Sequence, residues 1–322
     1  MGLRRLPGTD LDVSPICLGT ALFGATIDTP TAYALLDAFV ERGGNFIDTA
    51  RSYNDWIPGE RSRSEGLIGR WLADRRHRAR CVIATKGGHA ADDDSPRLNA
   101  RDLTADIDAS LARLHVDAID LYYVHRDDAA TPVAAIIDAL NLHIIAGKIR
   151  YIGCSNWSAS RIREANAHAA ASGQAAFVAN QPMWSAAVID PTALPDRTLA
   201  VMNDDMRLLH SETGLACVPF SSQAGGLFTK MASPLTALRY RLGQTPAGYP
   251  SRANRRRYQA LAAVAASRSL EVSQVVLGYL MSQPFVTVPI VGCRTVDQLS
   301  HTLAASDTRL DQSDLDAIEA AR

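Results

Sequence analysis

The chain has 322 residues, of which 47% are hydrophobic and 21% are charged, and its formal net charge at pH 7 is -1. A nearly neutral chain lacks the basic excess typical of proteins that bind nucleic acid or anionic lipid, so neither partner is expected. No run of about 18 consecutive apolar residues is present, and Pro7 and Gly8 come too early for a secretory leader. We therefore expect a cytoplasmic globular protein with no membrane partner.

The chain opens with a predicted hairpin and then repeats one unit. Residues 3–14 are typical of a short hairpin turned by Pro7 and Gly8. Each following unit is a short apolar run, a polar turn and a helical pattern, and the runs are mostly apolar rather than alternating, as in parallel strands covered on both faces. The predicted strands are 16–20, 45–49, 81–86, 118–125, 149–155, 177–181, 216–220 and 286–292.

The helical stretches between these runs complete the fold prediction. Residues 31–42 and 132–146 repeat apolar side chains at three- and four-residue steps and stop at Gly43 and Gly147. Eight such units predict an α/β fold, a closed (β/α)8 TIM barrel, as a single domain over residues 1–322 with the hairpin as a cap on its N-terminal mouth. Residues 221–252 show no clean period and predict a long loop after strand 7, of the kind that often forms a lid.

Four polar residues stand at the predicted carboxyl ends of three neighbouring strands. Asp48 and then Tyr53 follow the second strand, Lys86 ends the third and His125 ends the fourth. In barrel enzymes the chemistry takes place at this end of the strands, so the four side chains are expected to converge. Taken singly, each fits a turn or a solvated strand end, and the functional prediction therefore depends on their joint placement.

The combination suits the reduction of a carbonyl group. A free tyrosine has a pKa of about 10, and a nearby ammonium such as Lys86 would lower it toward a useful range. Asp48 would pair with the buried Lys86, His125 would orient the substrate oxygen by a hydrogen bond, and Tyr53 would supply the proton.

At this point the sequence resembles the aldo-keto reductase family. FIDTARSY, IATKGG and LYYVH match the family's catalytic tetrad in order, on Asp48, Tyr53, Lys86 and His125. The resemblance extends over nearly the whole chain, through GKIRYIGCSN, VANQ, VPFSSQAGGLFTK and VPIVGCRTVDQL. It implies an oxidoreductase of the NADPH-dependent type, an alcohol:NADP+ oxidoreductase, that needs no metal and reduces a small-molecule aldehyde or ketone.

The resemblance also implies a cofactor site along the later strands. The nicotinamide would contact Ser155, Asn156 and Gln181 and stack on Phe220, and the pyrophosphate and adenosine would lie along Ser221, Gln223, Gly225, Leu227, Lys230, Gly292, Arg294 and Gln298. Arg294 suits a 2′-phosphate and favours NADPH. His301 and Thr302 stand where the family usually has Glu-Asn, which leaves NADH as the alternative cofactor.

The substrate and the wider role are less strongly indicated. Trp56, Arg126 and Trp184 are predicted to line the substrate pocket, and the polar run 126–128 would suit a sugar-like carbonyl, with loop packing and a solvated turn as the competing interpretations. The alternative function is an NADPH-binding regulatory subunit, because the resemblance includes the branch of potassium-channel β subunits. The sequence indicates neither the direction of the reaction nor the oligomeric state.

Overall fold

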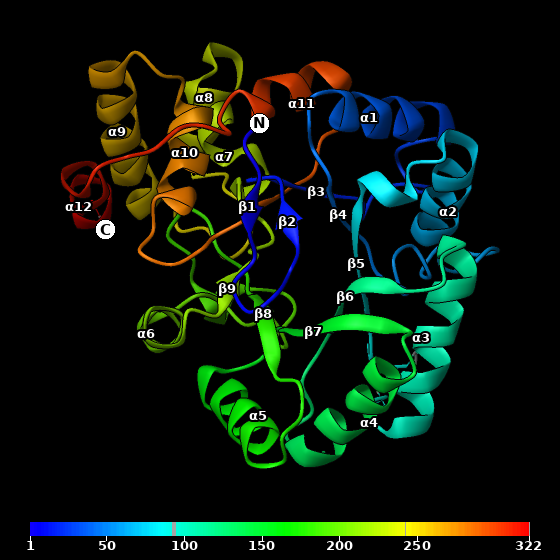
Figure 1. Ribbon diagram of the computed structural model, residues 1–322. Helices are drawn as coiled ribbons and strands as arrows, with labels where there is room; N and C mark the ends of the chain where they lie inside the picture. Colours follow the sequence, from blue (N-terminus) through cyan, green and yellow to red (C-terminus); the bar gives the residue numbers. More distant parts are fainter. Residues whose placement is uncertain (92–94, 242, 322) are drawn as a thin grey trace.

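The computed structural model describes residues 1–91, 95–241 and 243–321. Within these ranges one sheet of parallel strands runs in the order β10-β3-β4-β5-β6-β7-β8-β9 (Figure 1). The strands are β3 (Cys17–Gly19), β4 (Phe46–Asp48), β5 (Val82–Gly87), β6 (Ile119–Val124), β7 (Ile149–Ser155), β8 (Phe177–Gln181), β9 (Ala216–Cys217) and β10 (Ile290–Val291). Each predicted strand overlaps one of them, and the predicted barrel architecture is confirmed.

The sheet closes on itself at the pair formed by β9 and the segment that leads into β10. Cys217 bridges to Thr287 in parallel. The Cys217 amide donates to the Val286 carbonyl at 2.9 Å, and the Val288 amide donates to the Cys217 carbonyl at 2.8 Å. The backbone N–H and C=O groups of β9 are therefore hydrogen-bonded to the segment that leads into β10, as barrel closure requires.

Helices surround the barrel on the outside (Figure 1). They are α1 (Thr29–Glu41), α2 (Arg63–Arg75), α3 (Ala100–Leu114), α4 (Val133–Ile145), α5 (Ala159–Ala171), α6 (Asp204–Thr213), α7 (Leu227–Ala232), α8 (Pro234–Arg241), α9 (Ser251–Arg268), α10 (Val272–Met281), α11 (Val296–Leu303) and α12 (Gln312–Ala320), with short turns η1 (Arg78–Arg80), η2 (Pro191–Ala193) and η3 (Ala224–Gly226). Several begin at side-chain caps; Asn99, for example, accepts the Asp102 amide at the start of α3.

The N-terminal hairpin closes the bottom of the barrel. Strands β1 (Arg4–Arg5) and β2 (Asp12–Val13) pair antiparallel. Leu6 and Leu11 of this hairpin are buried in the same apolar cluster as Phe46 and Leu121, which fill the barrel interior. Because these leucines cover the interior at the N-terminal ends of the strands, a candidate site is to be sought at the opposite mouth.

The long connection after β9 contains more regular structure than its sequence indicates. The predicted loop at 221–252 includes η3, α7 and α8, and α9 begins within it at Ser251. These helices are short and α8 carries no distinct apolar face, so a periodicity argument does not detect them. Among the described residues of this predicted loop, 221–223, 233 and 243–250 lack helix or strand.

No single helix among the described residues is long and apolar enough to cross a membrane, and one bent pair, α9 with α10 at 97°, passes the same length and composition test.

Candidate active site

The barrel strands bring the predicted catalytic residues to one place by simple alternation. Phe46, Ala84, Tyr123 and Ala179 lie in the apolar cluster inside the barrel. Side chains along a strand alternate between its two faces, so the next inward position lies two residues further on. These positions are Asp48 on β4, Lys86 on β5, His125 just after β6 and Gln181 on β8.

Lys86 is the centre of a buried hydrogen-bond network at this mouth. Its ammonium donates to Asp48 Oδ2 at 2.6 Å, to the Thr49 carbonyl at 2.7 Å and to the Tyr53 hydroxyl at 2.9 Å. Asp48 and Lys86 are each 1% exposed. The three N–H groups of the ammonium therefore all have acceptors, which is the condition for burying such a charge.

The pair keeps its charges because each partner supports the other. Burial lowers the pKa of Lys86, but Asp48 and Tyr53 outweigh this effect and raise it above the ordinary value. Burial raises the pKa of Asp48 above its ordinary value, and Lys86 and the Gln181 amide reduce this rise. Gln181 Nε2 donates to Asp48 Oδ1 at 2.8 Å. Each carboxyl oxygen of Asp48 thus accepts a hydrogen bond, one from the ammonium and one from the amide. Such bonds favour the ionised form of the carboxyl group.

The pKa of Tyr53 differs from the sequence-based expectation. Burial raises it above the ordinary value, while Lys86 lowers it, so the ammonium acts in the expected direction but does not dominate. The reason is that the hydroxyl lies against the buried ammonium inside the mouth, where water solvates the phenolate poorly. Without a bound ligand, Tyr53 is therefore a protonated phenol at neutral pH.

His125 lies beside Tyr53 and is neutral. The two rings are 6.0 Å apart in an edge-on arrangement, and a second imidazole, His89, lies 5.0 Å from His125. Burial, Lys86, Arg126 and His89 all lower the pKa of His125 well below its ordinary value. A neutral imidazole can donate one hydrogen bond to a substrate oxygen without competing for the proton of Tyr53.

The residues predicted to hold the nicotinamide line the next strands of the barrel. Ser155 donates to the Gln181 carbonyl at 2.9 Å. Asn156 is buried in the left-handed conformation, with φ 62°, and its amide donates to the His125 carbonyl at 3.2 Å. Phe220 is half-buried and follows the inward-facing Val218 by two residues. These side chains continue around the mouth from the catalytic network.

Beyond Phe220 the backbone forms an open, glycine-rich turn. Ser221, Ala224, Gly225 and Gly226 all have positive φ. A side chain added at Gly225 would meet no atom within 4 Å, and the same holds at Gly292 after β10. The Phe220 ring, the uncovered backbone of this turn and the nearby Lys230 ammonium together fit an extended dinucleotide. Gln223 is half-buried and Lys230 is exposed, donating to the Gly225 carbonyl at 2.9 Å, but Leu227 is buried and packs inward.

The last predicted block lies around the start of α11. Arg294 and Gln298 are both exposed, and Gln298 Oε1 accepts the Arg294 amide at 2.9 Å. The two residues that depart from the family pattern have different surroundings: His301 is exposed, with its Nε2 2.9 Å from Oε2 of the exposed Glu271, and Thr302 is buried beside Cys293.

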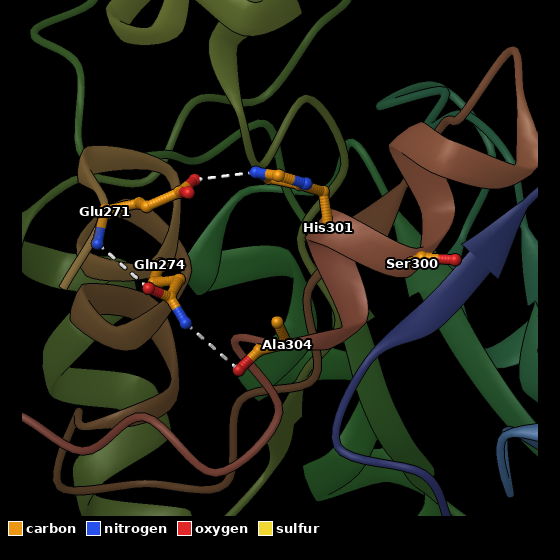
Figure 2. A pocket seen from close by; sticks show the side chains of 5 residues that line it. All are labelled: Glu271, Gln274, Ser300, His301 and Ala304. Carbon is orange, nitrogen blue, oxygen red and sulfur yellow. Dashed lines mark hydrogen bonds and ion pairs between the residues drawn. The ribbon is translucent and has the colours of Figure 1, made fainter.

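A shallow cavity of about 270 Å³ lies between the N-terminus of α10 and α11 and is lined by Glu271, Gln274, Ser300, His301 and Ala304 (Figure 2). Figure 2 shows the Glu271 carboxylate and the His301 ring facing each other across it. None of the residues of the Lys86 network lines this cavity, so it is separate from the site of the chemistry.

The three residues predicted to line the substrate pocket have different surroundings. Trp56 is 69% exposed on the loop after β4 and is free to contact a ligand. Arg126 is bound within the fold, to Asp196 at 3.1 Å and Thr198 at 3.0 Å. Trp184 is 4% exposed and packs against Arg207, Tyr279 and Phe285, the contacts of a core residue. It lies just beyond the end of β8, where its amide donates to the Phe220 carbonyl at 3.2 Å.

Sequence reasoning missed two charged residues next to the Lys86 network. Arg51 lies between Asp48 and Tyr53, and its Nε is 3.2 Å from Asp106 Oδ1 on α3. Asp106 is 2% exposed. A signal was present, because this carboxylate stands on the apolar face of α3 beside Leu103, Ile107 and Leu114, where an unpaired charge would be costly.

Comparison with known proteins shows similarity over nearly the whole chain. The sequence model described as "Aldo/keto reductase family" matches residues 15–322. Norsolorinic acid reductase stcV of Emericella nidulans is 30% identical, over 99% of this chain and 81% of its own length. The uncharacterized oxidoreductase YrpG of Bacillus subtilis is 31% identical over 97% of this chain and 93% of its own length. The aryl-alcohol dehydrogenase GME11368 of Pestalotiopsis microspora is 29% identical over 99% of this chain and 82% of its own length.

We expect the Asp48–Lys86 pair to be energetically coupled in the folded protein. Asp48→Asn leaves a buried ammonium without its counter-charge and should lower the free energy of unfolding by about 3–5 kcal/mol, with Lys86→Met costing a similar amount. The double variant should lose clearly less than the sum, as measured by urea unfolding at pH 7. Asp12→Asn, which breaks the exposed pair with Arg5, is the control and should change stability little. Strict additivity of the two buried substitutions would contradict the coupling.

Proposed function

The chain belongs to the aldo/keto reductase family, whose members are oxidoreductases that use nicotinamide cofactors, and we propose that it reduces an aldehyde or ketone to an alcohol with Tyr53 as the general acid. The observation that carries this proposal is the 2.9 Å hydrogen bond between the Lys86 ammonium and the Tyr53 hydroxyl, with a neutral His125 beside it. We further propose that the whole chain, residues 1–322, acts as one domain.

His125 and Tyr53 would bind the substrate oxygen. The two rings lie 6.0 Å apart in a T-shaped arrangement at the barrel mouth, so one oxygen atom can accept from both the imidazole and the phenol. Both donors are fixed before the substrate arrives, because His125 is backed by its own amide, which donates to the Gly87 carbonyl at 2.8 Å, and Tyr53 by Lys86. Fixed donors stabilise negative charge on that oxygen without reorganisation.

Tyr53 would then give its proton to the oxygen as the carbon is reduced. The carbonyl π bond breaks, one C–H bond and one O–H bond form, and a phenolate remains on Tyr53. Lys86 stabilises this phenolate, since its ammonium already donates to the same oxygen, and Asp48 holds the ammonium in place. The network therefore favours the product side of the proton transfer, although burial alone raises the pKa of Tyr53.

The cofactor would lie along the open turn after Phe220. Nicotinamide, when bound, supplies the hydride for the reduction. Ser155, Asn156 and Phe220 would hold the ring over the mouth, and the exposed backbone at Gly225 would receive the pyrophosphate. Lys230, Gly292, Arg294 and Gln298 would follow the chain of the cofactor toward its adenosine end.

NADPH is the proposed cofactor because of Arg294. Its guanidinium is exposed at the start of α11, and a planar fork of donors binds a 2′-phosphate well. His301 and Thr302 favour neither cofactor here, since one pairs with Glu271 and the other is buried beside Cys293.

An aromatic carbonyl compound is the proposed substrate class. The polar side chains at 126–128, which suggested a sugar, already have partners within the protein. Arg126 pairs with Asp196, and Asp127 pairs with Arg161 at 3.0 Å. Asp128 accepts a hydrogen bond from Thr131 at 2.6 Å. The exposed Trp56 ring and the two imidazoles near Tyr53 offer stacking surfaces instead. Relatives named for norsolorinic acid reduction and for aryl-alcohol dehydrogenation agree with this class.

Tyr53→Phe should abolish most of the turnover. We expect purified protein to oxidise NADPH in the presence of a substituted benzaldehyde faster than with an aldose, and kcat to fall by about 10²- to 10⁴-fold in the variant because the proton donor is lost. Cofactor affinity, measured by fluorescence quenching, should be unchanged.

Tyr151→Phe is the matched control, because this phenol donates to Asp10 on the N-terminal hairpin, away from the barrel's open mouth. A Tyr53→Phe variant with normal kcat would refute the acid role, and a preference for aldoses would refute the substrate class.

Arg294→Ala should separate the two cofactors. A hydrogen bond to a charged group contributes about 1.5–3 kcal/mol, so the Kd for NADPH should rise by about 10- to 100-fold while that for NADH stays the same. The exposed Arg309, which donates to backbone carbonyls of Ser306 and Thr308, provides a control as Arg309→Ala. Equal weakening of both cofactors by Arg294→Ala would count against recognition of the 2′-phosphate.

A further inference from the structure

Asp106 connects three segments at the catalytic mouth although it touches none of the proposed catalytic side chains. It lies on α3 and is 2% exposed. Its Oδ2 accepts the Gly88 amide at 2.9 Å. Its Oδ1 accepts from Arg97 at 2.7 Å and lies 3.2 Å from Arg51 Nε. One buried carboxylate thus contacts the segments that follow β4 and β5.

Arg51 carries this contact into the loop of Tyr53. Its amide donates to the Lys86 carbonyl at 3.0 Å, and its own carbonyl accepts from the Ser62 hydroxyl at 2.7 Å. Arg51 Nη1 lies 2.8 Å from Asp55, which in turn accepts the Ser62 amide at 2.7 Å. The loop from residue 49 to residue 62 is closed by these bonds, and Arg51 ties the closed loop to α3.

Asp106 reaches the other loop because strand β5 ends in glycine. A Cβ at Gly87 would lie 2.0 Å from the Tyr122 hydroxyl and 2.8 Å from Asp106 Cβ. Only a residue without a side chain lets β5 approach α3 so closely. The Gly88 amide, two residues after Lys86, can therefore donate directly to Asp106, which fixes the end of the strand that presents the ammonium.

We propose that Asp106 is a positioning residue for the reaction, which sets the distance between the Tyr53 hydroxyl and the Lys86 ammonium by holding the loop that carries Tyr53 and the end of the strand that carries Lys86. The proposal rests on the proposed function, since it assigns Asp106 its effect through Tyr53. The charge of Asp106 is the essential feature, because an amide could still accept the Gly88 N–H but would leave Arg51 and Arg97 without their shared anion.

The fold contains a matched control in Asp120. This carboxylate is 3% exposed, accepts the Ile83 amide at 2.8 Å and pairs with Arg78 and Arg150, each at 2.9 Å. Asp120 therefore has the same chemistry as Asp106: one backbone amide and two guanidinium groups on a buried carboxylate. It lies at the start of β6, at the end of the barrel away from the Lys86 network.

The experiment compares Asp106→Asn with Asp120→Asn in the full-length protein. We expect both to lower the unfolding midpoint, but only Asp106→Asn to lower kcat for aryl aldehyde reduction, by about 10- to 100-fold, because a displacement of about 1 Å at the reacting groups has an effect of this size. The KM for NADPH should change less than threefold in either variant, about the scatter of such comparisons. Hydrogen–deuterium exchange should accelerate in residues 49–62 of Asp106→Asn and not of Asp120→Asn.

Three results would overturn the proposal: an unchanged kcat in a folded Asp106→Asn, equal losses of kcat in both variants, or unaltered exchange of residues 49–62. If Asp106→Asn does not fold, Arg51→Gln tests the same link from the partly exposed side. In Arg51→Gln we expect the same loss of kcat, and in Arg51→Lys we expect part of it to be restored. An Arg51→Gln variant with full kcat would refute the proposal. Absence of turnover in the unmodified protein would instead refute the proposed function, and the exchange experiment would still decide whether Asp106 holds the loop.

Discussion

The whole site depends on one buried ammonium group. Lys86 is 1% exposed, and its three hydrogen bonds go to Asp48, to the carbonyl of Thr49 and to Tyr53. All three acceptors belong to β4 or to the loop that follows it. A buried cation is tolerated only when such acceptors are in place, so the pairing of β4 with β5 and the path of the loop are conditions for folding as well as for chemistry. Stability and reactivity are therefore coupled at this residue.

The barrel fixes the positions of the strand ends, and small residues allow its strands and helices to pack closely. Inward-facing positions are apolar through most of each strand and become polar only at the last one, which confines the charged groups to one mouth. Gly87 lets β5 approach α3, and at Gly153 a Cβ would lie 2.7 Å from the Tyr123 ring. Substitution at either glycine would displace a neighbouring strand. The same close packing that fills the barrel thus fixes the positions of Lys86 and His125.

The outline of the fold and the grouping of Asp48, Tyr53 and Lys86 follow from short-range patterns. Apolar runs and their order predict the strands, and polar residues at strand ends predict the mouth. The surroundings of single side chains are harder to predict. Trp184 lies beyond the end of β8 and packs into the core, and Leu227 packs inward from a helix that the sequence pattern did not indicate. The net direction of the Tyr53 pKa depends on burial, which no local pattern reports. Asp106 could have been noticed as a charge on an apolar helix face, but its partners come from the segments that follow β4 and β5.

The most direct test of this account is the pH dependence of kcat for the reduction, measured with protiated and deuterated cofactor to establish that the chemical step is observed. Burial and the nearby cations lower the pKa of His125 well below the ordinary histidine value of about 6.5, and burial raises the pKa of Tyr53 above the ordinary tyrosine value of about 10. Both groups thus keep the protonation state needed for reduction throughout this interval. The account predicts a kcat that is constant between these values and falls only at higher pH, as Tyr53 loses its proton. A rate that declines within the interval would contradict the assignment of a buried phenol as the acid.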